Sequence, residues 1–345
     1  MIDWARVHIP FKHSPLNGGE VVSIDEDGEV AWRILKRKQA IGSFDKRISF
    51  KSIGGDGQGN ATHLWISGNP SKFLQGHNVF GSDDLVSLMF DTFRVICNQF
   101  NFQPTLQEYQ AIKNGDYELG IVDINYSYEL PKRADVQAFI RALEFKAKTR
   151  HGRPSMKGGT LYFGKNSERW AIKLYAKGEE LSTKTGALPD ALKHQGIEDW
   201  ADNKLRIELR LLSKELAKLG IKHAATLTPE LTEKLFKEYL DKINMTDQIK
   251  LSNETVNQLP NKLKSTYTLW AQGHDLRSLM SKRTYYYHRK ELESYGINID
   301  LAPCSEHQKE NNVVPMIRIL EATPANIPRW AFTKNLIHSS AQRSA

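Results

Sequence analysis

The sequence predicts an α+β fold, with an antiparallel-sheet domain followed by a mainly helical domain. Three segments lead to this prediction, because 119–126, 170–177 and 204–211 each alternate apolar and polar side chains, as strands with one buried face do. Helical patterns lie between these strands, and they dominate the last third of the chain. We therefore expect a first domain at residues 1–225 and a second at residues 226–345.

The N-terminal half is expected to mix short strands with two amphipathic helices. Glycine-rich residues 54–60 lack the lysine of a phosphate-binding loop and open no helix, so a hairpin connection is expected there. Residues 68–81 have neither a helical nor a strand period, which predicts a loop. The expected elements are, in order, strands at 2–9, 29–35, 47–51 and 62–67, a helix capped by Ser82, the 119–126 strand, a helix at 134–148, and a hairpin of 159–163 and 169–176.

The C-terminal half begins with a helix that Thr228 caps and that has Pro229 at its first position. Helices at 262–272, 275–280 and 282–295 follow, and this spacing predicts a helix-turn-helix of the winged type. A small bundle with a solvated basic face is the alternative. The DNA-binding interpretation is favoured because arginine, lysine and tyrosine cluster on the third helix, namely Arg283, Tyr286, Tyr287, Arg289 and Lys290.

Length, charge and cysteine content limit the class of protein. The 345 residues are enough for two domains with real cores, and the net charge of +8 suits a polyanionic partner such as nucleic acid. Cys97 and Cys304 form no CxxC pair, which argues against a disulfide framework or a zinc ribbon and indicates a reducing compartment. No apolar run is long enough to cross a membrane, and a signal peptide is not expected.

The chemistry-bearing residues lie on the polar faces of the three predicted strands. Tyr175 is placed between Lys173 and Lys177, while the other two strands contribute Asp123 and Glu208. If the strands share a sheet, these side chains lie together on one face of it. The apolar residues that alternate with them, such as Ile172 and Ile207, then form the core on the other face. Such a surface can hold a divalent metal and a phosphodiester beside a tyrosine nucleophile. Taken alone, the tyrosine strand has a plainer explanation, an ordinary half-exposed tyrosine without chemistry.

Two long motifs carry a family resemblance. The segments 72–81 (KFLQGHNVFG) and 311–318 (NNVVPMIR), together with the opening Met1-Ile2-Asp3, resemble the gene II replication initiators of filamentous phages. The resemblance implies a rolling-circle initiator that nicks one strand of the double-stranded origin. It also implies a 5′-phosphotyrosine intermediate and later rejoining of the displaced single strand into a circle. An energy-conserving phosphotyrosine would make ATP unnecessary.

The resemblance also implies the roles of particular residues. The tyrosine of the family's Tyr-x-Lys strand falls on Tyr175, with its lysine at Lys177, and the two acidic strands place Asp123, Glu208 and the adjacent Arg206. Inside the first motif, Lys72 and Asn78 are assigned to DNA binding. Lys173 is expected to help stabilise the phenolate. Tyr126 and Tyr162 are the next candidates for the nucleophile.

No motif in the sequence identifies the metal ligands as directly as the Tyr-x-Lys motif identifies Tyr175. Wider rolling-circle nickases hold their metal with a His-hydrophobic-His pair, and none of the eleven histidines here forms one. We infer Mg²⁺ or Mn²⁺ bound by Asp123, Glu208 and His77. His77 could equally pin a tight loop, and His63 is the reserve candidate.

The remaining expectations concern partners and alternatives. The resemblance implies origin duplex, displaced single strand, and the host helicase and polymerase as partners, in the cytoplasm of the bacterial host. A non-catalytic origin-binding protein or repressor is the alternative function. The enzyme is favoured because the catalytic half is present, and a tyrosine recombinase is disfavoured because Tyr175 is expected on a strand.

Overall fold

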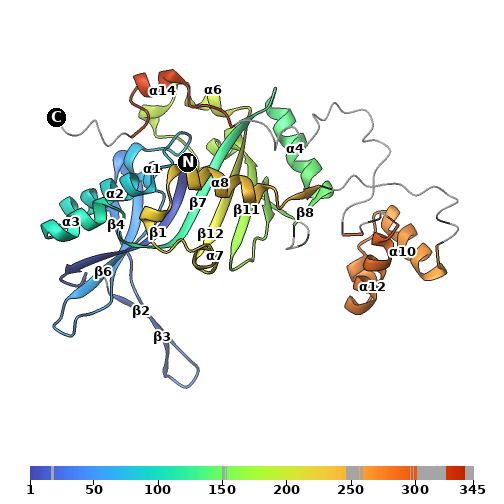
Figure 1. Cartoon of the computed structure of the whole chain (residues 1–345), viewed down its shortest axis with the longest axis horizontal. Coiled ribbons are helices and arrows are strands. Elements are labelled where there is room, and N and C mark those ends of the chain that lie inside the picture. The colour runs from blue at the N-terminus through green and yellow to red at the C-terminus, as the bar shows by residue number, and fades with distance from the viewer. Residues whose placement is uncertain are drawn as a thin grey trace.

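A nine-stranded antiparallel sheet dominates the computed structural model (Figure 1), which confirms the predicted α+β class. The structure describes residues 1–16, 19–149, 152, 154–245, 256, 259–295, 297, 299–300 and 324–338. The motif at 311–318 therefore lies outside the described residues. In spatial order the strands are β4 (Lys38–Ile41), β5 (Arg47–Ile53), β6 (Ala61–Gly68), β1 (Ile2–His13), β7 (Glu118–Glu129), β12 (Lys204–Leu212), β11 (Trp170–Ala176), β10 (Thr160–Phe163) and β9 (Ser155–Lys157).

The three strands on which the prediction depended lie side by side at the centre of this sheet. β12 pairs with β7 on one side and with β11 on the other, so their alternating side chains combine into two continuous faces. One face belongs to the large hydrophobic core. The strand residues that it buries include Val122, Ile124, Ile172, Leu174, Ile207 and Leu209. The predicted core of the central strands is thus confirmed.

Helices contribute apolar side chains to the same core. They are α2 (Leu85–Phe100), α4 (Arg133–Lys146), α7 (Ser213–Lys218) and α8 (Pro229–Leu240). The cap of α2 is Asp84, whose carboxylate accepts from the Ser87 amide, and not the predicted Ser82. The capping of α8 by Thr228 is confirmed. Helix α3 (Leu106–Lys113), with a complete capping box at Thr105 and Glu108, was not predicted.

The segment 68–81 was wrongly predicted to be all loop. It begins with α1 (Pro70–Gln75), whose start is specified by Asn69, since that side chain accepts from the Lys72 amide while Pro70 occupies the first turn. The helix is too short to show a period. It ends at Gly76, whose φ of 89° is readily available only to glycine, and the chain then turns into residues 77–80.

The end of the chain is divided between two hydrophobic clusters. α10 (Asn261–Ala271), α11 (Leu276–Leu279) and α12 (Lys282–Glu293) form a core of their own. By contrast, α14 (Arg329–Thr333) packs its Ala331 against Val79 and Phe80 of the N-terminal half. Helix α8 also packs with the main sheet, beyond the predicted domain boundary at residue 225. The division into two domains stays a prediction.

A hairpin of β2 (Glu20–Ile24) and β3 (Val30–Leu35) projects from the sheet (Figure 1). Several of its apolar side chains are exposed, among them Ile24 and Trp32. Only the second strand was predicted, because the apolar positions of β2 do not alternate. No helix in the described ranges is both long and apolar enough to cross a membrane.

Candidate active site

The polar face of the central strands carries the residues that sequence analysis singled out. Cross-strand pairing places Tyr175 opposite Arg206 and Lys173 opposite Glu208, while Arg210 lies opposite Asp123 on the next strand. Directly opposed side chains on one face of an antiparallel pair have Cβ atoms about 4.5–5.5 Å apart. The predicted grouping of Tyr175, Asp123 and Glu208 on one face of the sheet is therefore confirmed.

The Tyr175 hydroxyl donates a hydrogen bond to Glu208. The Tyr175 Oη to Glu208 Oε1 distance is 2.5 Å, and the tyrosine is only 9% exposed, in contrast to the outward position that the alternation predicted. Burial, with the negative charge of Glu208 adding to it, raises the pKa of Tyr175 well above its usual value. The resting tyrosine is thus protonated, with a carboxylate already in place to accept its proton.

Lys173 balances the charge of Glu208. Its Nζ lies 2.5 Å from Glu208 Oε2 and 3.9 Å from Asp123 Oδ2. Burial on its own would raise the pKa of Glu208, but the Lys173 ammonium holds that pKa below its usual value. Glu208 therefore remains an ionised proton acceptor.

Asp123 is bound by a different cation. Arg210 donates to both of its oxygens, with Nε to Oδ1 at 2.7 Å and Nη2 to Oδ2 at 2.6 Å. This bidentate pair uses the geometry in which a guanidinium fork fits a carboxylate best. The arginine that partners Asp123 follows from strand register, which the sequence alone did not provide.

His77 lies apart from both carboxylates. Its Nε2 is 2.8 Å from the Leu336 carbonyl oxygen, and its Nδ1 accepts from the Val79 amide at 3.2 Å. Burial lowers the pKa of His77 to about 4, so the ring is neutral at pH 7. With both nitrogens engaged, it pins a loop, which was the alternative explanation. The predicted trio does not come together, and the described residues contain no group of three or more potential ligands.

Asp3 on β1 is a site residue that sequence analysis missed. Its Oδ1 accepts from the Asn69 and Asn78 side-chain amides, each at 2.8 Å, and the residue is 8% exposed. Burial, with the charge of Glu208 adding to it, raises the pKa of Asp3. The opening Met1-Ile2-Asp3 was noticed only as part of a resemblance. Asp3 follows the core residue Ile2, so alternation turns its carboxylate to the polar face, and the pairing of β1 with β7 shifts register at this residue.

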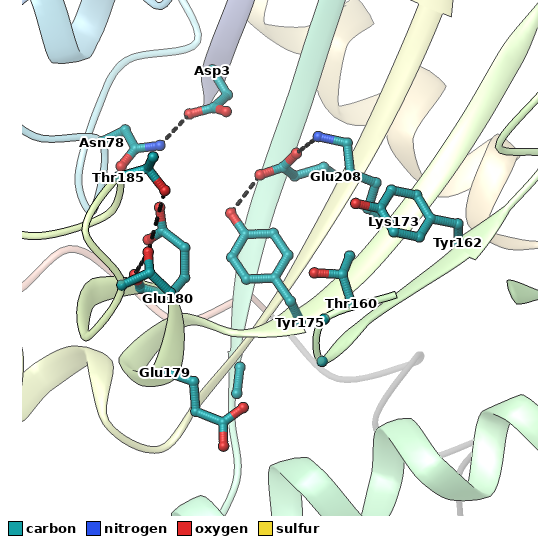
Figure 2. A pocket seen from close by; sticks show the side chains of 14 residues that line it. Asp3, Asn78, Thr160, Tyr162, Lys173, Tyr175, Glu179, Glu180, Thr185 and Glu208 are labelled. Carbon is teal, nitrogen blue, oxygen red and sulfur yellow. Dashed lines mark hydrogen bonds and ion pairs between the residues drawn. The ribbon is translucent and has the colours of Figure 1, made fainter. Parts of the chain in front are cut away.

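Tyr175, Lys173, Glu208 and Asp3 line one cavity of about 470 Å³ (Figure 2), whereas Asp123 and His77 do not. Tyr175 and Glu208 lie on one side of it, and Asn78 lies across from them beside Thr185 and Glu180 of the segment after β11, with Asp3 next to Asn78. Its lining offers hydroxyl groups and one lysine, Lys173, to a phosphate group, together with four carboxylates that would repel the phosphate unless a cation lay between them. The other lining residues are Gly158, Gly159, Thr160, Tyr162, Ala176, Glu179 and Thr183.

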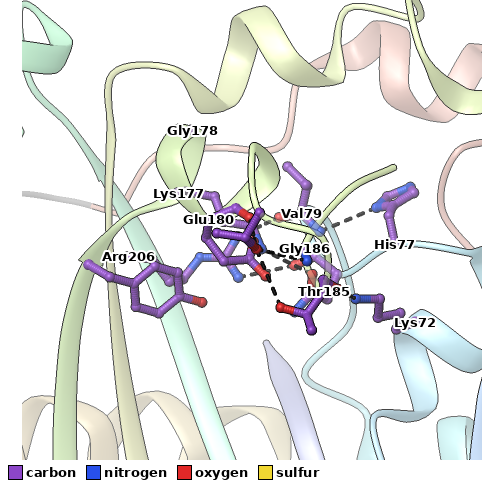
Figure 3. A network of polar contacts seen from close by, with 12 residues as sticks. Lys72, His77, Val79, Lys177, Gly178, Glu180, Thr185, Gly186 and Arg206 are labelled. Atoms are coloured by element: carbon purple, nitrogen blue, oxygen red, sulfur yellow. Dashed lines mark hydrogen bonds and ion pairs between the residues drawn. The ribbon is translucent and has the colours of Figure 1, made fainter. Parts of the chain in front are cut away.

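Lys177 does not lie beside Tyr175 on the sheet face, as had been predicted. The strand ends at Ala176, and Lys177 begins the short helix α5 (Lys177–Leu181). Its fully buried ammonium donates to Asn78 Oδ1 at 3.0 Å and to Glu180 Oε2 at 2.7 Å (Figure 3). Lys177 thus connects two segments that border the cavity.

Arg206 holds the loop that contains Asn78 and Val79 against the sheet. It is completely buried, and its guanidinium donates to the Asn78 carbonyl at 3.1 Å and to the Val79 carbonyl at 2.8 Å (Figure 3). It also donates to Ser127 Oγ at 2.8 Å and to Asn125 Oδ1 at 3.0 Å. With this many bonds inside the protein, Arg206 is a positioning residue and does not face the cavity.

Arg206→Lys is expected to lower the free energy of unfolding by at least about 2 kcal/mol, because a lysine cannot reproduce the fork and leaves buried acceptors unpaired. Chemical denaturation followed by fluorescence measures this. Arg133→Ala is the matched control, since its exposed pair with Asp202 should change stability by only about 0.5 kcal/mol. Equal stability of both variants would contradict an anchoring role.

The predicted DNA-binding residues lie in two separate places. Asn78 lines the cavity, and Lys72 donates to the Thr185 carbonyl at 2.9 Å. The others are on α12, where Arg283, Tyr286, Tyr287 and Lys290 are exposed. Arg289 is less available than predicted, because it pairs with Asp300 at 3.0 Å.

Comparisons with known proteins agree with this arrangement. Residues 1–230 match the family model for the N-terminal part of the phage replication-associated protein of the gene II type, and residues 251–337 match the model for its C-terminal part. The replication-associated protein of Enterobacteria phage I2-2 is 44% identical over 347 residues, and the alignment covers 100% of each chain.

Proposed function

Since the chain belongs to the family of the gene II replication-associated proteins of phages, we propose that it initiates rolling-circle replication by nicking one strand of the double-stranded origin through Tyr175. The protein stays attached to the 5′ end as a phosphotyrosine and later rejoins the displaced strand into a circle. The observation that carries this proposal is the 2.5 Å hydrogen bond from Tyr175 to Glu208 inside a cavity.

The proposed chemistry begins with a proton transfer. As the Tyr175 oxygen attacks phosphorus, its proton passes to Glu208, because a buried tyrosine hydroxyl is a poor nucleophile until a base removes its proton. The Tyr175 O–P bond forms, and the bond from phosphorus to the 3′-oxygen breaks. The proton on Glu208 then reaches the departing 3′-oxygen. Lys173 stays close to Glu208 and to the charge that develops.

We propose that a divalent metal binds two carboxylates of this cavity and not the predicted trio. Asp3 and Glu208 both line it, and Mg²⁺ is commonly held by one or two carboxylates together with a substrate phosphate. We propose these two residues as ligands in place of Asp123 and His77. When bound, Mg²⁺ or Mn²⁺ would withdraw charge from the scissile phosphate.

The direct test is to incubate the protein with supercoiled origin plasmid and Mg²⁺ and to search for nicked circles carrying covalently attached protein. Nuclease digestion and peptide mass spectrometry should find the remaining nucleotide on the peptide with Tyr175. A protein that binds the origin but yields neither nick nor adduct would favour the alternative, a non-catalytic origin-binding protein or repressor.

Recognition of the origin is proposed for α12. Arg283 and Lys290 lie on this helix with the exposed Tyr286, which suits contacts with phosphates and base edges in a groove. α10 and α11 would support it as a helix-turn-helix. We also propose action in the cytoplasm of the bacterial host, with host helicase and polymerase as the partners that the family resemblance implies.

Arg283→Ala with Lys290→Ala is expected to weaken origin binding by about 1–3 kcal/mol for each interaction with a base that the change removes, and to reduce discrimination against random duplex. Cleavage of a single-stranded oligonucleotide that carries the nick site should persist, because Tyr175 and Glu208 lie on the sheet. Titrations of origin and random duplex by fluorescence anisotropy at several salt concentrations measure the effect.

The double variant Lys234→Ala with Lys237→Ala is the control, since it removes the same charge from the exposed side of α8. It should lower affinity only through net charge and leave discrimination intact. If the α12 variant discriminated as well as the unchanged protein, recognition would have to lie elsewhere, for instance in the loops around the cavity.

A further inference from the structure

A second tyrosine, Tyr162, lines the same cavity as Tyr175. It lies on β10 directly opposite Lys173, so Tyr175, two residues farther along β11, is its diagonal neighbour on the same face. Diagonal neighbours of this kind are about 7–8 Å apart, which is within reach of long side chains. Figure 2 shows both tyrosine rings beside Lys173 and Glu208. The sheet therefore presents two phenols to one space.

The two hydroxyls differ in their surroundings. Tyr175 Oη is bonded to Glu208, whereas the Tyr162 hydroxyl has no hydrogen-bond partner among the residues that the structure describes. The Tyr162 ring is half-buried, and Lys165 Nζ lies 5.3 Å from its centroid. A cation on the ring and a free hydroxyl in the cavity leave Tyr162 available to a phosphodiester.

Strand β7, the middle strand of the nine, supplies a contrast. Tyr126 is paired with Ile207, on the core face, and its hydroxyl donates to Asp83 at 3.1 Å. It packs edge-to-face against Phe236 of α8. Tyr126 therefore cannot reach the cavity, and of the two reserve candidates only Tyr162 can take part in its chemistry.

We infer that Tyr162 is a second strand acceptor, which cleaves the regenerated nick site while Tyr175 is still esterified. This rests on the proposed function. Releasing a circle requires two exchanges, since the first cleavage leaves Tyr175 bound to the 5′ end and the finished unit must be cut again before its new 3′ end can close the circle. A chain with one acceptor would need a second copy for this cut, or would have to use water, which loses the bond energy of the cleaved phosphodiester.

The second cleavage and the closure of the circle account for every bond and proton without another reactant. In the first, the Tyr162 oxygen forms a bond to phosphorus at the regenerated site, the bond to the 3′-oxygen breaks, and the tyrosine proton ends on that oxygen. In the second, the new 3′-hydroxyl attacks the Tyr175 phosphodiester, closes the circle, and returns its proton to the Tyr175 oxygen. One phosphotyrosine is exchanged for another, so the bond energy is conserved.

The test separates the second cleavage from the first. Full-length protein is loaded through Tyr175 with a single-stranded oligonucleotide A, whose short upstream piece leaves with a free 3′-hydroxyl and is removed, and the loaded protein is purified. An uncut oligonucleotide B with the nick site is then added. The unchanged protein should produce a hybrid strand that joins the upstream part of B to A. Tyr162→Phe should load with A normally but lose the hybrid, because it keeps the ring and lacks the nucleophile.

Two controls identify the cause of that loss. A B strand that is already cut, with a free 3′-hydroxyl, should restore hybrid formation by Tyr162→Phe, which a misfolded or badly positioned site would not allow. Tyr126→Phe should behave as the unchanged protein does. Hybrid formation from uncut B by Tyr162→Phe at the normal rate would overturn the inference.

Hybrid formation that disappears when the loaded protein is diluted would also overturn it, because a second copy would then supply the acceptor. Failure to load A at all would be a failure of the proposed function and not of this inference. Loading without the second cut in the unchanged protein would count against Tyr162 alone.

Discussion

Tyr175→Phe is expected to abolish the first strand cleavage and its covalent protein–DNA adduct, lowering that rate by at least about 10⁴-fold, the scale on which removal of a nucleophile acts. The inferred cut by Tyr162 should be lost with it, because that cut follows only after Tyr175 carries DNA. The change deletes one hydroxyl from a cavity wall and leaves the ring packed in the sheet. Glu208 keeps its bond to Lys173, so the lost hydrogen bond should cost about 1 kcal/mol of stability. Single-turnover cleavage of a labelled single-stranded oligonucleotide measures the rate.

Origin binding by Tyr175→Phe should remain unchanged, because the exposed side chains of α12 do not belong to the cavity lining. Tyr126→Phe is the matched control for the loss of a hydroxyl, since it also removes one hydrogen bond but on the opposite face of the sheet. If Tyr175→Phe formed the adduct at the normal rate, the nucleophile would have to be another tyrosine, and Tyr162 would be tested first.

The strand part of this site could be predicted because alternation is a local property of sequence. The polar positions of three strands share one face whenever those strands pair in register, and they do so here. The partners within that face could not be predicted in the same way. Arg210 holds Asp123 and Lys173 holds Glu208 because of cross-strand register, which depends on the whole sheet.

The parts contributed by loops were harder to predict, because loops have no period. The short helix α1 and the turn at Gly76 direct Asn78 toward Asp3, and nothing in the apolar pattern of residues 68–81 indicates this. The placement of Lys177 depended on where β11 ends. One residue beyond the strand, its side chain turns to Asn78 and Glu180 instead of the tyrosine.

The burial of Tyr175 could not be predicted for the same reason, because it depends on a loop. Alternation correctly placed it away from the apolar core, but the segment after β11 borders the cavity and covers the polar face. A polar face of a sheet becomes a site when loops exclude water from it, because charges interact more strongly there. The completely buried Arg206 and Lys177 indicate how much polar bonding holds those loops in place.

Glu208→Gln is expected to lower the single-turnover cleavage rate by about 10²–10⁴-fold, the usual contribution of a general base. Glutamine has nearly the same shape, but it cannot accept the tyrosine proton during the attack. It also leaves the Lys173 ammonium without its closest carboxylate, 2.5 Å away in the unchanged protein. Rates measured over a range of Mg²⁺ concentrations should stay low at every concentration, because added metal cannot replace the base.

Asp123→Asn provides the comparison that makes this result specific to Glu208. It removes a carboxylate from the same sheet face, yet that carboxylate is bound by Arg210 and is not part of the cavity lining. Its cleavage rate should therefore fall much less than that of Glu208→Gln. An equal loss in both variants would mean that the charge of the face, and not a proton transfer from Tyr175, limits the reaction. Full activity of the unchanged protein in excess chelator would remove the metal from the proposed mechanism and leave Glu208 as a base alone.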